Sequence, residues 1–174
     1  MDTVTFLDAL KAFTIEQTKD MILPTQRQKG ETEPEYRAAN VYRQALPNGK
    51  TATKYAPYIL HKKVTGDDII GRSKRNRSLV VVRSIFCVFN EDAEEGSLML
   101  LNLMERMRIA FLKYPLLTDR YRLYTGDEDG KIQSVVYQED IQPYYAGEIV
   151  TVWEIPSVQE EPPEMNWQRD YTDG

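Results

Sequence analysis

The feature that most constrains the fold is a change of hydrophobic period between residues 78 and 114. From Ser78 to Asn90, β-branched and aromatic side chains occupy both alternating sets of positions. A strand that is apolar on both faces is typical of the interior of a sheet. From Ser97 to Tyr114, apolar residues recur every three or four positions, as on one face of a helix. The segment therefore predicts a central strand followed by a long amphipathic helix (about 97–114) that packs on the sheet.

Four acidic residues, Glu91, Asp92, Glu94 and Glu95, separate the two elements. Exposed carboxylates at the positive end of a helix contribute about 0.3–1 kcal/mol each. A calcium loop would need alternating oxygen ligands around a fixed glycine, and the sequence NEDAEEG does not supply them. We interpret these residues as a charged helix start and predict no metal site.

The N-terminal segment, Met1 to Ile22, also has helical periodicity, with Asp2 or Thr3 as its cap and Pro24 as its stop. The apolar stripe comprises Phe6, Leu7, Leu10, Phe13, Ile15 and Met21. Thr25 to Glu35 is polar and contains Gly30 and Pro34, which indicates an exposed loop. The pattern of Tyr36 to Leu46 fits a short helix or a strand equally well.

Strand signals recur on both sides of the central segment. Tyr55 to Val64 is predicted as a strand with Pro57 at its beginning or on an edge, because proline gives no ladder hydrogen bond. The following stretch, Thr65 to Arg77, is polar and is predicted as a connection. Tyr144 to Ile155 alternates as a last strand.

A polar GDEDG sequence lies between Asp119–Thr125 and Lys131–Tyr137. Two strand-like runs around such a tip predict an antiparallel hairpin. Together the segments predict an α+β fold: a mixed, mostly antiparallel sheet with an N-terminal helix and one long helix packed on it. We expect a single domain over residues 1–156 and an acidic C-terminal tail over residues 157–174.

The residue composition excludes several kinds of chemical site. Cys87 is the only cysteine and His61 the only histidine, so an intramolecular disulfide and a cysteine-based zinc site are excluded. Cys87 lies in the most apolar strand and is interpreted as a small buried hydrophobic residue. A hydrolytic triad has no support in the sequence. We predict no catalytic, cofactor-binding or metal-binding residue, no membrane contact, and synthesis in a cytoplasm.

The net charge of −5 comes from 27 acidic and 22 basic residues. Binding to phosphate backbones requires clustered positive charge, and the only basic run lies between Arg72 and Arg77. Duplex DNA or RNA is therefore a poor primary partner. An acidic surface is nevertheless suited to a passage to which DNA must not adhere.

Four segments in order, YAPYILHKKVTGDD, SLVVVRSIFCVFNED, GSLMLLNLMERMRIAF and QPYYAGEIVTVWEIP, resemble the tail terminator (tail completion) proteins of tailed bacteriophages that infect Gram-positive hosts. The resemblance extends over about Tyr55 to Pro156, and residues 25–54 form an insertion relative to that family. It implies a non-enzymatic virion protein that forms a ring, commonly a hexamer, at the tail–neck junction. The ring would cap the tail tube, end its polymerisation and join the tail to the head connector.

The resemblance also implies partners: further copies of the chain, the tail tube protein, the head-completion or connector protein and, in a contractile tail, the sheath protein. Genomic DNA would pass through the lumen without specific binding. Two polar segments, the predicted hairpin from Asp119 to Tyr137 and the loop from Thr65 to Arg77, are candidates for ring or tube contacts. Trp167 and Tyr171 are candidates for tail anchors on a partner. The candidate contact residues are Arg72, Lys74, Arg75, Arg77, Asp127, Glu128 and Asp129, the last three as a lumenal tip.

Three other interpretations remain open. Another neck or head-completion ring subunit would share the small size and acidity. A small enzyme would need convergent titratable groups in a cleft. A non-viral cytoplasmic adaptor would use the acidic tail to bind a partner.

Overall fold

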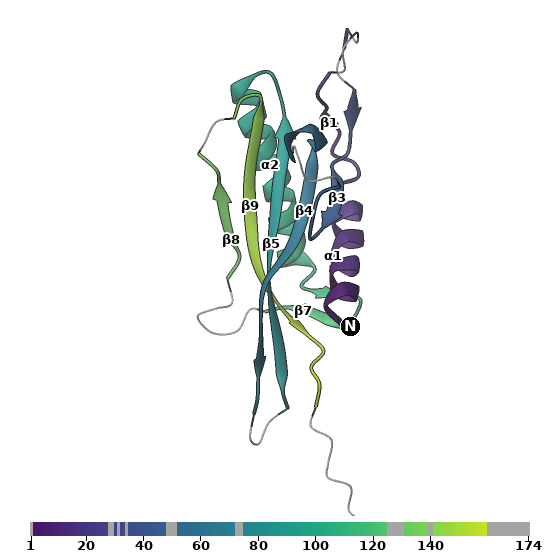
Figure 1. Ribbon diagram of the computed structural model, residues 1–174, viewed down its shortest axis with the longest axis vertical. Helices are drawn as coiled ribbons and strands as arrows, with labels where there is room; N and C mark the ends of the chain where they lie inside the picture. The colour runs from purple at the N-terminus through teal and green to yellow at the C-terminus, as the bar shows by residue number, and fades with distance from the viewer. Residues whose placement is uncertain are drawn as a thin grey trace, which may run out of the picture.

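The strand Arg77–Phe89 (β5) lies at the centre of a seven-stranded sheet (Figure 1). The computed structural model describes residues 2–27, 30, 32–33, 35–47, 52–71, 75–124, 131–138 and 141–159. Neighbouring strands follow the order β3-β4-β5-β9-β7-β6, and β8 pairs with a separate stretch of β9. The bounds are β3 Asn40–Arg43, β4 Tyr58–Ile69, β6 Leu116–Leu117, β7 Tyr121–Leu123, β8 Gln133–Val136 and β9 Tyr144–Ile155. The β3–β4 pair is parallel and the other pairs are antiparallel, which confirms the predicted α+β fold with a mixed sheet.

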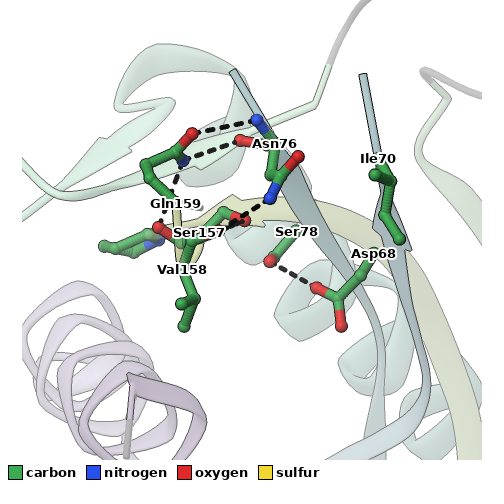
Figure 2. Close-up of a pocket in the computed structure, with 8 residues that line it drawn as sticks. Asp68, Ile70, Asn76, Ser78, Ser157, Val158 and Gln159 are labelled. Atoms are coloured by element: carbon green, nitrogen blue, oxygen red, sulfur yellow. Dashed lines mark hydrogen bonds between the residues drawn. The ribbon is translucent and has the colours of Figure 1, made fainter. Parts of the chain in front are cut away.

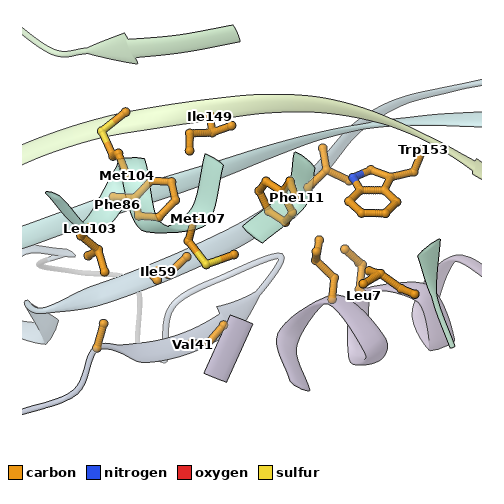
Figure 3. Close-up of a cluster of buried hydrophobic side chains, with 14 of the residues drawn as sticks. Leu7, Val41, Ile59, Phe86, Leu103, Met104, Met107, Phe111, Ile149 and Trp153 are labelled. Atoms are coloured by element: carbon orange, nitrogen blue, oxygen red, sulfur yellow. The ribbon is translucent and has the colours of Figure 1, made fainter. Parts of the chain in front are cut away.

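Two helices, α1 (Asp2–Thr18) and α2 (Ala93–Lys113), pack on the same face of the sheet. Trp153 of β9 lies fully buried between them, with its ring centroid 5.5 Å from that of Phe6 and 5.8 Å from that of Phe111 (Figure 3). Its indole N–H donates to Thr151 Oγ1 over 2.8 Å, so the buried polar atom is satisfied. Each large side chain buried in this way contributes about 1.5–3 kcal/mol to folding. The apolar faces of both helices therefore hold them on the sheet.

The other face of the sheet, which we call the open face, has a smaller buried cluster. It contains Tyr58 and Leu60 of β4 with Cys87 and Phe89 of β5, beside the 3₁₀ turn Ala52–Tyr55 (η1). Cys87 is 2% exposed, and burial is the main cause that raises the pKa of its thiol, to about 11. Its predicted place in the core is confirmed.

Two glycines allow the long helix to approach the sheet closely. A Cβ at Gly96 of α2 would lie 2.2 Å from Tyr145 Cε2, and one at Gly147 of β9 would lie 2.8 Å from Met104 Sδ. A larger residue at either position would force the two layers apart. Glycine is therefore required here by packing.

Both helices differ in detail from their predictions. The long helix begins at Ala93, four residues before the expected start, with Asp92 as N-cap accepting from the Glu95 backbone N–H over 2.9 Å. Glu94 therefore belongs to the first turn. In α1, Ile15 is exposed, whereas Thr14 and Thr18 are buried. Their hydroxyls donate to backbone carbonyls one turn earlier, so their burial leaves no hydroxyl unsatisfied.

The predicted polar connection after residue 64 is largely strand. β4 continues to Ile69 and β5 begins at Arg77, and the hairpin that they form extends beyond the body of the molecule (Figure 1). We call residues 64–77 the arm. A hairpin that is largely exposed to solvent needs no alternating apolar residues, so its sequence lacks the usual strand signal.

The predicted hairpin between residues 119 and 137 is wrong. β7 and β8 do not pair with each other; both pair with β9, at Arg122↔Glu154 and at Gln133↔Val150 through Val136↔Gly147. Each run has strand-forming residues, but periodicity does not identify the partner strand. The ambiguous stretch after Tyr36 is strand, since β2 (Tyr36–Arg37) pairs with β1 (Leu23–Pro24) and β3 follows it.

Candidate functional site

Exposed apolar side chains gather where β8 meets the start of α2. Leu101 of α2 and Val136 of β8 line one cavity of about 100 Å³, which makes the two elements one continuous surface. Ile141, 62% exposed, extends this surface past the end of β8. Contiguous exposed apolar surface is characteristic of binding sites. We call this set the β8 surface, and it comprises Leu98, Leu101, Val135, Val136, Tyr137 and Ile141.

A groove of about 730 Å³ lies beside β8 on the open face. Its floor includes Tyr58 and Cys87 from the sheet interior, and Val135, Ile141 and Tyr144 contribute further walls. These apolar and aromatic walls suit an apolar side chain of another molecule.

A short polar network fixes the position of β8. The Tyr137 hydroxyl donates to Glu148 Oε2 over 2.6 Å, and Arg83 Nε donates to the same oxygen over 2.8 Å. The hydrogen bond with Glu148 is the main cause that raises the pKa of Arg83, whereas burial is the main cause that raises the pKa of Tyr137. The network holds the end of the short strand against β9, so the β8 surface has a defined shape.

The arm carries a second exposed apolar group. Ile70 is 80% exposed, and Val64 and Ile69 are about half exposed. Residues Thr65–Ile69 pair with β5 on one side, and no other described strand pairs with their outer edge. An exposed pair of isoleucines on a projecting hairpin is a second candidate contact surface.

The outer end of the arm is held by a reciprocal pair of amides (Figure 2). The Gln159 side chain accepts from the Asn76 backbone N–H over 3.0 Å and donates to its carbonyl over 3.1 Å. The Asn76 side chain in turn donates to the Val158 carbonyl over 3.0 Å. A cavity of about 330 Å³ beside this clamp is lined by Ile70 and by Val158, which is 85% exposed. The clamp therefore holds residues 157–159 next to the apolar part of the arm.

The residues predicted from sequence for this role are only partly within the described structure. Arg75 is exposed at the end of the arm. Arg77 forms an ion pair with Glu154 over 2.9 Å, and its guanidinium lies 5.3 Å from the Tyr124 ring centroid. Its hydrogen bond with Glu154 is the main cause that raises the pKa of Arg77, so this cation is already engaged within the subunit. The other candidates, Arg72, Lys74, Asp127, Glu128, Asp129, Trp167 and Tyr171, lie outside the described residues.

The open face shows the same ion-pair arrangement twice. Arg77 of β5 pairs with Glu154 of β9. Arg83, six residues later in β5, pairs with Glu148, six residues earlier in the antiparallel β9. Glu154 is in register with Leu79, and Glu148 is in register with Ile85. Each arginine therefore lies two residues before the β5 residue opposite its glutamate. These two arginines are therefore each paired with a glutamate of the neighbouring strand.

His61 lies in the core, with its side chain between α1 and β5. Its Nε2 is 2.9 Å from Thr14 Oγ1 and its Nδ1 is 2.8 Å from Ser84 Oγ. The imidazole is 0% exposed, and burial lowers its pKa to about 3, so it is neutral near neutral pH. Ser84 is equally buried, so a substrate cannot reach this serine–histidine pair in the folded chain. Among the described residues, no group of three or more His, Cys, Asp or Glu side chains is arranged to hold a metal ion.

Comparisons with known proteins give no match, either to the model of a protein family or to a curated sequence. In the part of the chain that the structure describes, no helix is both long and apolar enough to cross a membrane.

Proposed function

We propose that this chain is a tail terminator: a structural virion protein that forms a ring at the tail–neck junction, caps the tail tube and joins it to the head connector. The four segments that resemble this family correspond to β4, β5, α2 and β9. These elements are neighbours in the structure, with three adjacent strands and the helix that packs on two of them. The resemblance therefore covers one contiguous structural unit.

The observation that carries the proposal is the presence of two exposed apolar surfaces, one at β8 and one on the arm. Exposed isoleucine, leucine and valine side chains in such groups are costly in water and favour association. A protein that acts as a building block needs such surfaces. No bond-making step is assigned to it.

The physical role follows from how a tube grows. Tube subunits stack head to tail, an open arrangement without a built-in end. A terminator must match the tube on one ring face and refuse a further tube subunit on the other, so its specificity depends partly on what it does not bind. The expected partners are further copies of the chain, the tube protein, the connector protein and, in a contractile tail, the sheath protein.

Imaging of particles made without this protein tests the proposal. We expect overlong tubes that lack heads in negative-stain micrographs, and normal tails when the protein is supplied again. Tails of uniform length joined to heads in its absence would refute termination. Normal tail length with unjoined heads, and density for the chain on the portal side only, would identify a different neck ring subunit.

A further inference from the structure

We propose that neighbouring copies contact each other through two different surfaces, with the arm of one copy seated on the β8 surface of the next. This inference rests on the proposed ring and specifies the contact that builds it. The occupant of the β8 surface is thus a second copy of this chain.

The two surfaces lie at different places on the molecule. β4, which forms half of the arm, lies on one side of β5, whereas β8 lies beyond β9 on the other side. The arm extends from the lower end of the view in Figure 1, and β8 lies along its left edge. One surface is a narrow projection with Ile69 and Ile70, and the other includes an apolar groove of about 730 Å³. A projection and a groove at separate places allow each copy to hold the next.

Charge complementarity supports this occupant. The arm, residues 64–77, contains four basic and two acidic residues, and one of the basic residues, Arg77, is paired with Glu154 within the subunit. The sequence from Glu91 to Leu98 contains four acidic residues and no basic residue. Glu94 precedes Leu98 and Leu101 by one and two helical turns, on the same helix face. The arm therefore carries a small net positive charge, and acidic residues border the β8 surface.

The same charges disfavour contacts between like surfaces. Two arms would bring basic residues together, and two β8 surfaces would bring together the acidic starts of two α2 helices. Arm-to-β8 contact joins opposite charges instead. A contact between unlike surfaces generates a ring when the rotation between copies closes, as the proposed function requires.

Cysteine crosslinking tests this contact. The native Cys87 is buried, so substitutions at the exposed Ile70 and Ile141 introduce the reactive thiols without disturbing the core. The full chain carrying both Ile70→Cys and Ile141→Cys is treated with a short bismaleimide and analysed on a denaturing gel. We expect a ladder of covalent dimers, trimers and larger species. A 1:1 mixture of the two single variants should stop at dimers, and each single variant alone should remain monomeric.

Several results would overturn the proposal. A covalent dimer from Ile70→Cys alone would indicate arm-to-arm contact, and one from Ile141→Cys alone would indicate contact between two β8 surfaces. Absence of a ladder from the double variant, both in solution and on assembled tails, would refute the contact. Circular dichroism of each variant confirms that it is folded.

Introduction of a charge into each apolar surface provides a second measurement. Ile70→Asp and Ile141→Asp should each sediment as a monomer, and their mixture should sediment as a heterodimer, because only one intact surface of each kind remains. The outcomes separate the two proposals: overlong tubes without a crosslinking ladder would leave termination standing and remove this contact. A crosslinking ladder, together with normal tails in particles that lack the protein, would leave this contact standing and refute termination.

Discussion

The Nε2–H of His61 donates to Thr14 Oγ1 across 2.9 Å and joins β4 to α1 inside the core. The tautomer follows from proton counting. The Thr14 hydroxyl proton is donated to the Leu10 carbonyl over 2.8 Å, so Thr14 Oγ1 acts as acceptor for the imidazole. Nδ1 then accepts from the Ser84 hydroxyl over 2.8 Å. All three polar side chains are satisfied only while the imidazole is neutral.

Stability should therefore fall as acid is added. His61 has a folded-state pKa of about 3 against an ordinary value of 6.5, so the unfolded chain binds the proton first. The contribution of this group is fully present above pH 6.5 and is lost as the pH falls from there towards about 3. We expect the free energy of unfolding, measured in urea, to depend on pH more steeply in the wild type than in His61→Gln. The difference in slope should be up to about 1.4 kcal/mol per pH unit. Parallel pH profiles would contradict the burial of a neutral imidazole.

Removal of the Thr14 hydroxyl should leave the imidazole N–H without an acceptor. We expect Thr14→Val to lower the free energy of unfolding by about 1–3 kcal/mol, the usual cost of an unsatisfied buried polar group. Thr14→Ser keeps the hydroxyl and should cost less. Chemical denaturation of both variants at neutral pH compares them, and a valine variant more stable than the serine variant would refute the hydrogen-bond chain.

Gly96→Ala should destabilise the protein although alanine is the better helix former. The gain in helix propensity is about 1 kcal/mol, whereas the added methyl group would lie 2.2 Å from Tyr145 Cε2, and overpacking costs about 1–3 kcal/mol. The matched control is the same change combined with Tyr145→Ala, where the methyl group has space. There Gly96→Ala should be neutral or stabilising relative to Tyr145→Ala alone, as measured by thermal and urea unfolding.

Tyr137→Phe should loosen β8 and leave the centre of the sheet unchanged. It removes the 2.6 Å hydrogen bond to Glu148 that holds the end of this strand. A loss of about 1–2 kcal/mol corresponds to exchange of the backbone amides of residues 133–137 that is roughly 5–30 times faster. Hydrogen–deuterium exchange measures the rates of these amides directly. Tyr144→Phe, which loses a hydrogen bond to Gln26 instead, should leave those amides unchanged.

The parts of the fold that were predictable from sequence are those with a buried face. β5, β9 and the body of α2 repeat apolar residues at strand or helix spacing because one side of each must face the core. The arm was predicted as a connection because neither of its faces is buried over most of its length. The hairpin prediction around residues 125–130 failed because β7 and β8 both pair with β9, and a local pattern contains no information about a distant partner.

The candidate site was harder to predict for a related reason. Charged residues were chosen as contacts, whereas the exposed residues that the structure brings together are Leu101, Val136 and Ile141 on one surface and Ile70 on another. Apolar residues at regular spacing are interpreted as core unless the tertiary structure shows them outside. One available signal was the Ile69–Ile70 pair, which stands within an otherwise polar stretch.

The paired strands of the open face have a consequence for any polyanion that travels past it. Arg77 and Arg83 each lie against a glutamate of the next strand, so their positive charge is matched before a phosphate group can reach it. These two arginines therefore offer a passing nucleic acid little free positive charge. A passage lined by charges matched in this way would favour movement of the nucleic acid over its retention.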